Sequence, residues 1–98
     1  MNFDDIIYSA LSQVPYGHAV SYGALARLAG YQNHARHVGR LLKNLPTDTQ
    51  LPWHRVVNSQ GKISLPEGSD SFKEQHARLL SEGILIKNNR IKKPYFLG

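Results

Sequence analysis

Glycine and proline recur at short intervals along the chain, and their spacing limits the length of the helices and strands that its 98 residues can form. Pro15 and Gly17 close a first apolar segment, Gly30 closes a second, and Gly83 closes the last long one. Each stop removes a backbone donor or favours a left-handed turn, so the elements between stops must be short. A chain of this length buries only roughly 60 to 65% of its unfolded surface. We therefore predict one domain, spanning residues 1–98, with a modest core.

The N-terminal half has the pattern of three short helices. Apolar residues recur at helical spacing over residues 3–11. Residues 20–30 begin with a capping serine, Ser21, and end with glycine, which predicts a second helix of about two turns. A third helix is predicted over residues 33–43, with basic residues along one face. Two short helices joined by a glycine-containing turn, the second with a basic stripe, are typical of a helix-turn-helix.

The C-terminal half alternates loops, strands and one helix. Pro46 and Pro52 interrupt regular structure, so the stretch between them is predicted to be a loop. Val56 and Val57, followed by the turn-forming residues 58–61 and by Ile63, predict a small hairpin. Ser71 and Glu74 have the spacing of a capping box, which predicts a last helix that stops at Gly83.

A second hairpin is predicted around Asn88 and Asn89, in the position of the wing that often accompanies helical DNA-binding domains. The expected fold class is thus mainly α with small β-hairpins, a winged helix-turn-helix.

Charge and composition narrow the function classes. Twelve Lys and Arg against seven Asp and Glu give a net charge of +5, which suits a polyanion partner or simply a basic soluble surface. The chain has no cysteine, which excludes disulfides, thiolate metal sites and a cysteine nucleophile. Its five histidines are scattered, so we expect no metal and no cofactor. No apolar stretch approaches the roughly 20 residues that span a bilayer, and Asp4 and Asp5 stand where a signal peptide is basic. A cytoplasmic location is the default expectation.

Residues 51–57, which read Leu-Pro-Trp-His-Arg-Val-Val, concentrate aromatic, basic and polar groups between a loop and a hairpin. Together with residues 20–23, 35–39 and 82–83, this stretch resembles the DNA-binding domain of the O6-alkylguanine-DNA alkyltransferases. The resemblance covers roughly residues 14–83. In that family the corresponding segment reads Pro-Cys-His-Arg-Val, and here Trp53 stands at the alkyl-accepting cysteine. That substitution, with the loop at residues 63–66, resembles the alkyltransferase-like proteins.

Position 53 decides the chemistry. Moving an alkyl group off guanine O6 requires a soft nucleophile such as a thiolate, and an indole cannot replace it at neutral pH. We therefore expect no enzyme activity. Trp53 can instead form a broad apolar wall for an alkylated base, in a pocket shared with Pro52, Val56 and Tyr22. The alternative is a tryptophan buried in the core.

The resemblance also implies how the base would reach this pocket. Arg36 corresponds to the arginine that intercalates in place of the extruded base, and Tyr22 to the tyrosine that turns the adjacent phosphate. The alternatives are a surface arginine and a helix-capping tyrosine. Ala35 and Gly39 would let the helix approach the minor groove closely. Arg40 and Lys43 would contact phosphates.

Four further residues are expected to form a structural network. His54 and Glu82 match the family residues that activate the cysteine, and Asn44 matches the asparagine that ties the DNA-reading helix to the site. Arg55 could join the network or reach DNA. The chain departs from the family at residues 65–69, which replace a Gly-Tyr-Ser-Gly type loop that closes over the base. The contacts of that lid therefore do not transfer.

These features predict a non-enzymatic damage sensor. It would bind duplex DNA containing O6-alkylguanine as a monomer associated with the nucleoid, flip the damaged nucleotide, and pass it to nucleotide excision repair. Two alternatives remain. One is a dimeric winged-helix regulator that reads a palindromic sequence. The other is an enzyme, either a residual alkyltransferase or a hydrolase that uses His54 and Glu82.

Overall fold

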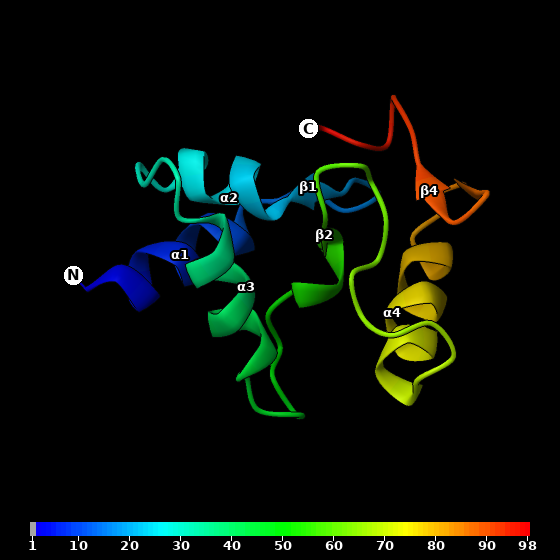
Figure 1. Cartoon of the computed structure of the whole chain (residues 1–98), viewed down its shortest axis with the longest axis horizontal. Helices are drawn as coiled ribbons and strands as arrows, with labels where there is room; N and C mark the ends of the chain where they lie inside the picture. Colours follow the sequence, from blue (N-terminus) through cyan, green and yellow to red (C-terminus); the bar gives the residue numbers. More distant parts are fainter. Residues whose placement is uncertain (1) are drawn as a thin grey trace.

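The computed structural model describes residues 2–98, which form a mainly helical fold with two small sheets of two strands each. This confirms the predicted fold class. Figure 1 shows α1, α2 and α3 on one side and α4 with the hairpin at β4 on the other, with β1 and β2 between them. In chain order the elements are α1 (Phe3–Ser12), β1 (Val20–Ser21), α2 (Tyr22–Leu28), α3 (Ala35–Lys43), a 3-10 turn η1 (Trp53–Arg55), β2 (Val56–Val57), α4 (Asp70–Ser81), β3 (Ile86–Lys87) and β4 (Arg90–Ile91).

The first two helices form where the sequence predicts them. In α2 the Ser21 hydroxyl accepts from the Ala24 amide at 3.0 Å, and Gly30 ends the segment with φ +87°. The third helix begins at Ala35, two residues later than predicted. Asn33 has φ +65°, a left-handed conformation that a right-handed helix cannot contain. The error arises because a short polar asparagine adopts this conformation readily.

The hairpin predicted after Val57 is wrong. Strand β2 pairs in parallel with β1, with Val20 opposite Val56 and Ser21 opposite Val57. A tight turn does follow, since the Asn58 amide donates to the Lys62 carbonyl at 2.8 Å, but no strand follows it. Both valines are buried, and β1 offers them a buried partner 36 residues away in sequence that local patterning cannot reveal.

The cap of α4 also differs from the prediction. The Ser69 hydroxyl accepts from the Phe72 amide at 3.2 Å, so Ser69 is the N-cap and Ser71 lies inside the first turn. Glu74 is consequently two residues further into the helix than a capping box requires, and it pairs with Arg78 instead of reaching back to a cap. The stop at Gly83 is confirmed by its φ of +81°.

The second predicted hairpin is confirmed. Strands β3 and β4 pair antiparallel around Asn88 and Asn89, whose φ values of +55° and +59° are those of a two-residue type I′ turn. The turn of residues 58–61 meets this hairpin, because the Ile91 amide donates to the Gly61 carbonyl at 2.8 Å. A Cβ at position 61 would overlap the Ile91 carbonyl oxygen, so this contact requires glycine.

Two apolar clusters form the core, and the short β1–β2 sheet divides them. Successive strand side chains point to opposite faces, so Val56 joins the first cluster and Val57 the second. The first cluster joins α1, α2 and α3; its fully buried large members include Ile7, Leu11, Leu25 and Val38. The second joins α4 to the C-terminal segment; it contains Ala19, Leu79, Ile84 and Ile91. The 3-10 turn η1 leads directly into this dividing sheet.

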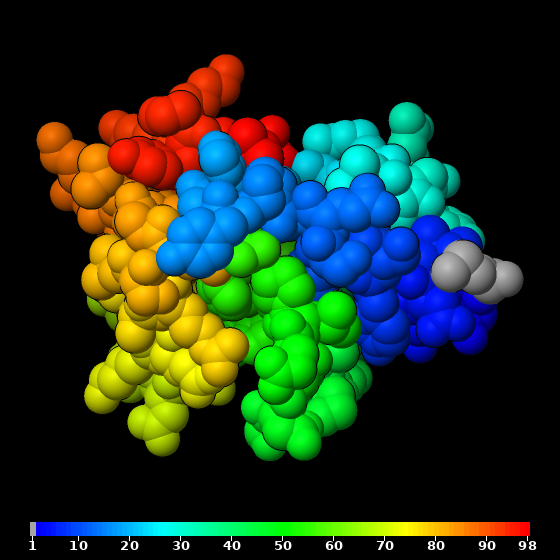
Figure 2. Space-filling view, turned by 180° about the vertical axis from the view of Figure 1, so that it is seen from behind, coloured from blue at the N-terminus to red at the C-terminus, as the bar shows by residue number. Residues whose placement is uncertain are grey.

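The last residues of the chain return to β1. The Ala19 amide donates to the Tyr95 carbonyl, and the Leu97 amide donates to the Ala19 carbonyl, both at 2.8 Å. Figure 2 shows the C-terminal residues, in red and orange, packed beside the segment that leads into β1. The C-terminal segment thereby covers the second cluster. Within the described residues, no helix has the length and apolar character needed to cross a membrane.

Candidate nucleic-acid interface

Helix α3 presents a basic face to solvent. Arg36, Arg40 and Lys43 are all exposed, as their spacing predicts, while Val38 is fully buried beneath them. Among residues 2–98, none of the three basic side chains forms an ion pair. These charges are therefore available to phosphate groups.

Ala35 and Gly39 lie at the edge of this basic face. Both are half-buried where α3 packs on α2. A Cβ at Gly39 would stand 3.7 Å from the ring of Tyr22, and one at Gly23 would stand 3.9 Å from the Ala35 methyl. Close packing of the two helices therefore requires small side chains at these positions, and the predicted approach of Ala35 and Gly39 to the minor groove stays a prediction.

Tyr22 connects three parts of the molecule. It is the first residue of α2, its ring faces Gly39 of α3, and its hydroxyl lies 2.7 Å from the hydroxyl of Ser64 in the loop before α4. Ser21, not Tyr22, caps the helix. The phenol thus stands between α3 and the loop that contains Ser64.

Trp53 opens η1 and is half-buried. Its amide donates to the Leu51 carbonyl at 2.8 Å, and the Arg78 guanidinium carbon lies 5.5 Å from the centre of its ring system. It belongs to neither apolar cluster, so the alternative of a core tryptophan does not describe this structure. The neighbouring Pro52 is also half-buried. Val56 is only 1% exposed within the first cluster and does not line an open pocket, contrary to expectation.

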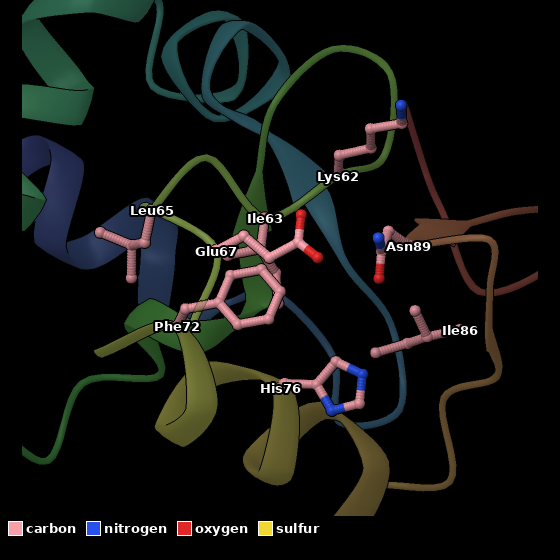
Figure 3. A pocket seen from close by; sticks show the side chains of 8 residues that line it. All are labelled: Lys62, Ile63, Leu65, Glu67, Phe72, His76, Ile86 and Asn89. Atoms are coloured by element: carbon pink, nitrogen blue, oxygen red, sulfur yellow. The ribbon is translucent and has the colours of Figure 1, made fainter. Parts of the chain in front are cut away.

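The structure has a cavity of about 300 Å³ between residues 62–67, α4 and the β3–β4 hairpin (Figure 3). It is lined by Lys62, Ile63, Leu65, Glu67, Phe72, His76, Ile86 and Asn89. Trp53, Pro52 and Tyr22 are not among these residues. Ile63 and Leu65 line it while Ser64, between them, bonds Tyr22, so the cavity lies on the opposite side of the loop. The predicted base pocket is therefore not this cavity.

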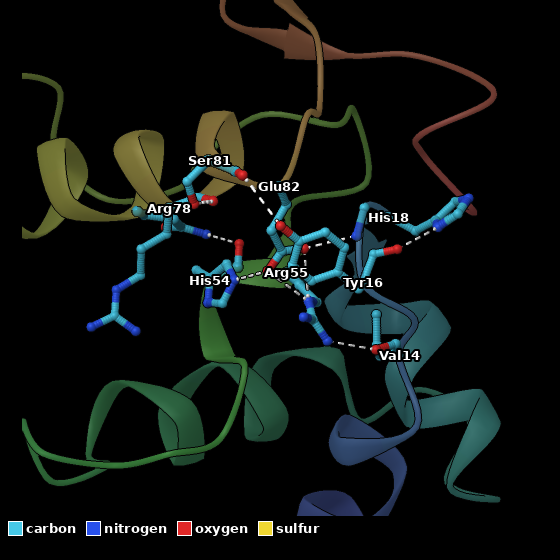
Figure 4. Close-up of polar contacts among 10 residues, drawn as sticks. Val14, Tyr16, His18, His54, Arg55, Arg78, Ser81 and Glu82 are labelled. Atoms are coloured by element: carbon cyan, nitrogen blue, oxygen red, sulfur yellow. Dashed lines mark hydrogen bonds and ion pairs between the residues drawn. The ribbon is translucent and has the colours of Figure 1, made fainter.

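His54, Arg55 and Glu82 form a compact hydrogen-bonded network (Figure 4). The Glu82 carboxylate accepts from His54 Nε2 at 2.5 Å and from Arg55 Nε at 3.0 Å, and it also accepts from the Gly17 amide at 2.8 Å. Arg55 also donates to the Val14 carbonyl at 2.8 Å. The network joins the C-terminal end of α4, the 3-10 turn and the loop after α1. Of the two predicted roles for Arg55, the structure shows the place in the network, with the side chain largely buried.

Burial alone would raise the pKa of Glu82, but hydrogen bonds from Arg55, His54 and the Gly17 amide outweigh it. The pKa of Glu82 therefore lies below its ordinary value, and the carboxylate is charged at neutral pH. A charged acceptor strengthens the hydrogen bonds that it receives.

Two further groups complete the placement of η1. The buried Gln75 amide of α4 donates to the carbonyls of His54 and Val56 at 3.1 and 2.9 Å. His54 Nδ1 is buried and has no hydrogen-bond partner among residues 2–98. Asn44 lies outside the network, contrary to expectation. It is exposed and caps the C-terminus of α3 through its backbone amide, so the helix ends before this side chain can reach the site.

The sequence analysis missed Arg78 and Ser64. Arg78 follows Glu74 and precedes Glu82 by four residues each, so helical spacing places all three on one face of α4. That spacing could have identified Arg78. The contact of Ser64 with Tyr22 joins positions 42 residues apart and has no local signal.

The histidines do not form a metal site. Within the part of the chain that the structure describes, no three side chains of the ligand types His, Cys, Asp or Glu come together. His34 and His37, one turn apart, lie instead in an aromatic group with Phe3, whose ring stacks on His37 at 4.1 Å.

Comparison with known proteins agrees with this geometry. Residues 2–84 match the family described as 6-O-methylguanine DNA methyltransferase, DNA binding domain. A "DNA base-flipping protein" of Vibrio parahaemolyticus is 50% identical over 80 residues, which cover 82% of this chain and 78% of the relative. "Alkyltransferase-like protein 1" of Schizosaccharomyces pombe is 42% identical over 80 residues, or 82% and 74%.

A solved structure of the S. pombe protein Atl1 "in complex with damaged DNA containing O6-carboxymethylguanine" superposes with a TM-score of 0.86. The sequence identity is 36%, and the match covers 100% of this chain and 99% of the other. The resemblance to alkyltransferase-like proteins is thus confirmed. Trp53 stands at the cysteine position of the family, and the 98 residues contain no cysteine. The chain belongs to the family of the 6-O-methylguanine DNA methyltransferase DNA-binding domain, as a member without the alkyl-accepting thiol.

Proposed function

We propose that the protein is a DNA damage sensor that binds O6-alkylguanine in duplex DNA, flips the damaged nucleotide and holds it against Trp53. The observation that carries the proposal is the position of Trp53. Its indole stands outside both apolar clusters, half-exposed, at the family's reactive position and beside an intact His54–Glu82 pair. The complex of the related S. pombe protein with damaged DNA supports the same reading.

The basic face of α3 supplies the first step. Arg40 and Lys43 would contact phosphates, which gives affinity without sequence preference. Extruding a nucleotide costs a few kcal/mol for unstacking and unpairing. Arg36, exposed and unpaired among residues 2–98, would offset part of this loss by stacking in the vacated position and bonding the orphaned base.

The pocket for the base is assembled on binding. In the free structure, the hydrogen bond between Tyr22 and Ser64 holds the loop of residues 62–67 against the DNA-reading helices. A phosphate that engages the Tyr22 hydroxyl would compete with Ser64 for it. Release of the loop would then free the side of Tyr22 that Ser64 occupies.

Binding is the whole reaction in this proposal. The chain offers no thiol, and Glu82 and Arg55 hold His54 as part of the scaffold. Tight holding alone would only shield the lesion, so the complex would be passed to nucleotide excision repair proteins. The protein would act as a monomer at the nucleoid in the cytoplasm. The β3–β4 hairpin, with exposed Lys87 and Arg90, would serve as the wing.

A gel-shift series with an O6-methylguanine duplex and its unmodified twin tests the proposal. We expect tighter binding to the damaged duplex, no preference among flanking sequences, and one protein per lesion. Equal affinities for the two duplexes would reject lesion recognition. A preferred palindrome bound by a dimer would favour a transcription regulator.

Incubation with duplex radiolabelled on the methyl group separates holding from chemistry. We expect all label to remain on the DNA. Label on the protein would reveal transfer, and released label would reveal hydrolysis.

A further inference from the structure

One face of α4 holds every side chain of η1. Glu82 binds His54 and Arg55, while Arg78, one turn earlier, lies over Trp53 with its guanidinium carbon 5.5 Å from the ring centre. Glu74, one turn earlier again, accepts from Arg78 Nη2 at 2.6 Å. In Figure 4 the Arg55 guanidinium points toward Val14, whereas the Arg78 guanidinium points away from the network around Glu82. The two arginines therefore contact different parts of the protein.

Among the described residues, Arg78 is the cation that lies over the Trp53 ring. Trp53 joins neither apolar cluster, and its other recorded ring neighbour, His54, meets it edge-on at a centroid distance of 6.2 Å. A guanidinium over an indole face is attracted by the ring quadrupole and can stack on it through its own planar surface. Glu74 restrains the guanidinium from the other end.

We propose that Arg78 is a positioning residue for lesion recognition: it fixes the plane of Trp53 before DNA arrives. This inference rests on the proposed function. Because Arg78 lies over one face of the indole, the flipped base would contact the part of the ring that Arg78 does not cover. A wall that is already ordered does not have to be ordered during binding. Ordering a free side chain weakens binding roughly 2- to 12-fold.

The free protein gives the first test. Trp53 is the only tryptophan in the chain, so fluorescence excited at wavelengths that the five tyrosines do not absorb reports on this position alone. Arg78→Met keeps an unbranched side chain but removes the guanidinium. We expect a changed emission spectrum and faster depolarisation of the indole, with partial recovery in Arg78→Lys. Lys73→Met removes the same charge from an exposed site on α4 and should match the wild type. Wild-type depolarisation in Arg78→Met overturns the proposal.

DNA binding gives the second test. The ratio of dissociation constants for unmodified and O6-methylguanine duplexes should fall roughly 2- to 12-fold in Arg78→Met relative to Lys73→Met. Arg78→Lys should recover part of the ratio. An unchanged ratio despite a mobile indole also overturns the proposal. If the wild type itself shows no preference, the proposed function fails, while the fluorescence of the free protein still decides whether Arg78 holds Trp53.

Discussion

The side chain at position 53 determines what the neighbouring His54–Glu82 pair can do. A thiol beside such a pair can be ionised to a thiolate. An indole has no comparable proton to lose at neutral pH, so the same hydrogen bonds only fix the loop. His54 Nδ1, buried and without a partner among residues 2–98, is consistent with a network whose outer member has been replaced.

Trp53 and Arg36 should separate lesion preference from general affinity. We expect Trp53→Ala to lose most of the preference for O6-methylguanine DNA while keeping its affinity for unmodified duplex, because in the proposed complex the DNA group that the indole contacts is the flipped base. Arg36→Ala should weaken binding to the damaged duplex by about 1 to 3 kcal/mol. Titrations of both variants against both duplexes check this. An equal loss for the two duplexes in Trp53→Ala would contradict its role.

A sequence motif identifies site residues only where they are adjacent in the chain or match positions of a known family. Trp53, His54 and Arg55 are adjacent in the chain, and Glu82 follows from the family resemblance. Arg78 acts through a cation–π contact across 25 positions, which a motif does not record. Val56 follows directly after Trp53, His54 and Arg55, which favours a place in the pocket. Its parallel pairing with β1 instead buries it in the core.

Elements with their own stop signals could be predicted, and those that depend on distant partners could not. The hairpin at Asn88–Asn89 carries its turn in its sequence, as α2 carries its cap. Strand β2 lacks such a signal, because its partner β1 lies at the other end of the helix-turn-helix. The α4 cap was misplaced because Ser69 and Ser71 both suit an N-cap, and the side chain of Ser69 makes the bond.

The contact between α2 and the loop before α4 should be measurable as a coupling. Tyr22→Phe and Ser64→Ala each remove the 2.7 Å hydrogen bond, so their effects on the free energy of unfolding should not add. Each should cost about 0.5 to 1.5 kcal/mol. Hydrogen exchange of the free protein should be faster over residues 62–67 in either variant. Ser59→Ala, an exposed serine in the preceding turn, serves as the control. Strictly additive effects would show that the bond does not hold the loop.

At the scale of the whole molecule, Glu82 ties three segments together through charge. Its lowered folded-state pKa means that its contribution to stability is present above the unfolded value of about 4.3 and is lost as pH falls through the folded pKa. At neutral pH we expect Glu82→Gln to lower the free energy of unfolding by about 3 kcal/mol, because Arg55 loses its buried partner.

This difference between wild type and Glu82→Gln should shrink in denaturant titrations repeated at pH values below about 4.3. Glu74→Gln is the matched control, since it breaks a pair in which Glu74 is 52% exposed and should cost under about 1 kcal/mol. A pH-independent difference would place the effect of Glu82 elsewhere than in its charge.

The return of the C-terminal residues to β1 sets a limit on shortening the protein. The family match stops at residue 84, yet Ile91 belongs to the second cluster and Tyr95 and Leu97 supply the outer backbone partners of Ala19. A protein truncated at residue 84 would lose these backbone hydrogen bonds, and one edge of the segment before Tyr22 would be exposed to solvent. The residues beyond the family match thus support the strand that leads into Tyr22, the residue to which we assign the turning of the phosphate in the proposed function.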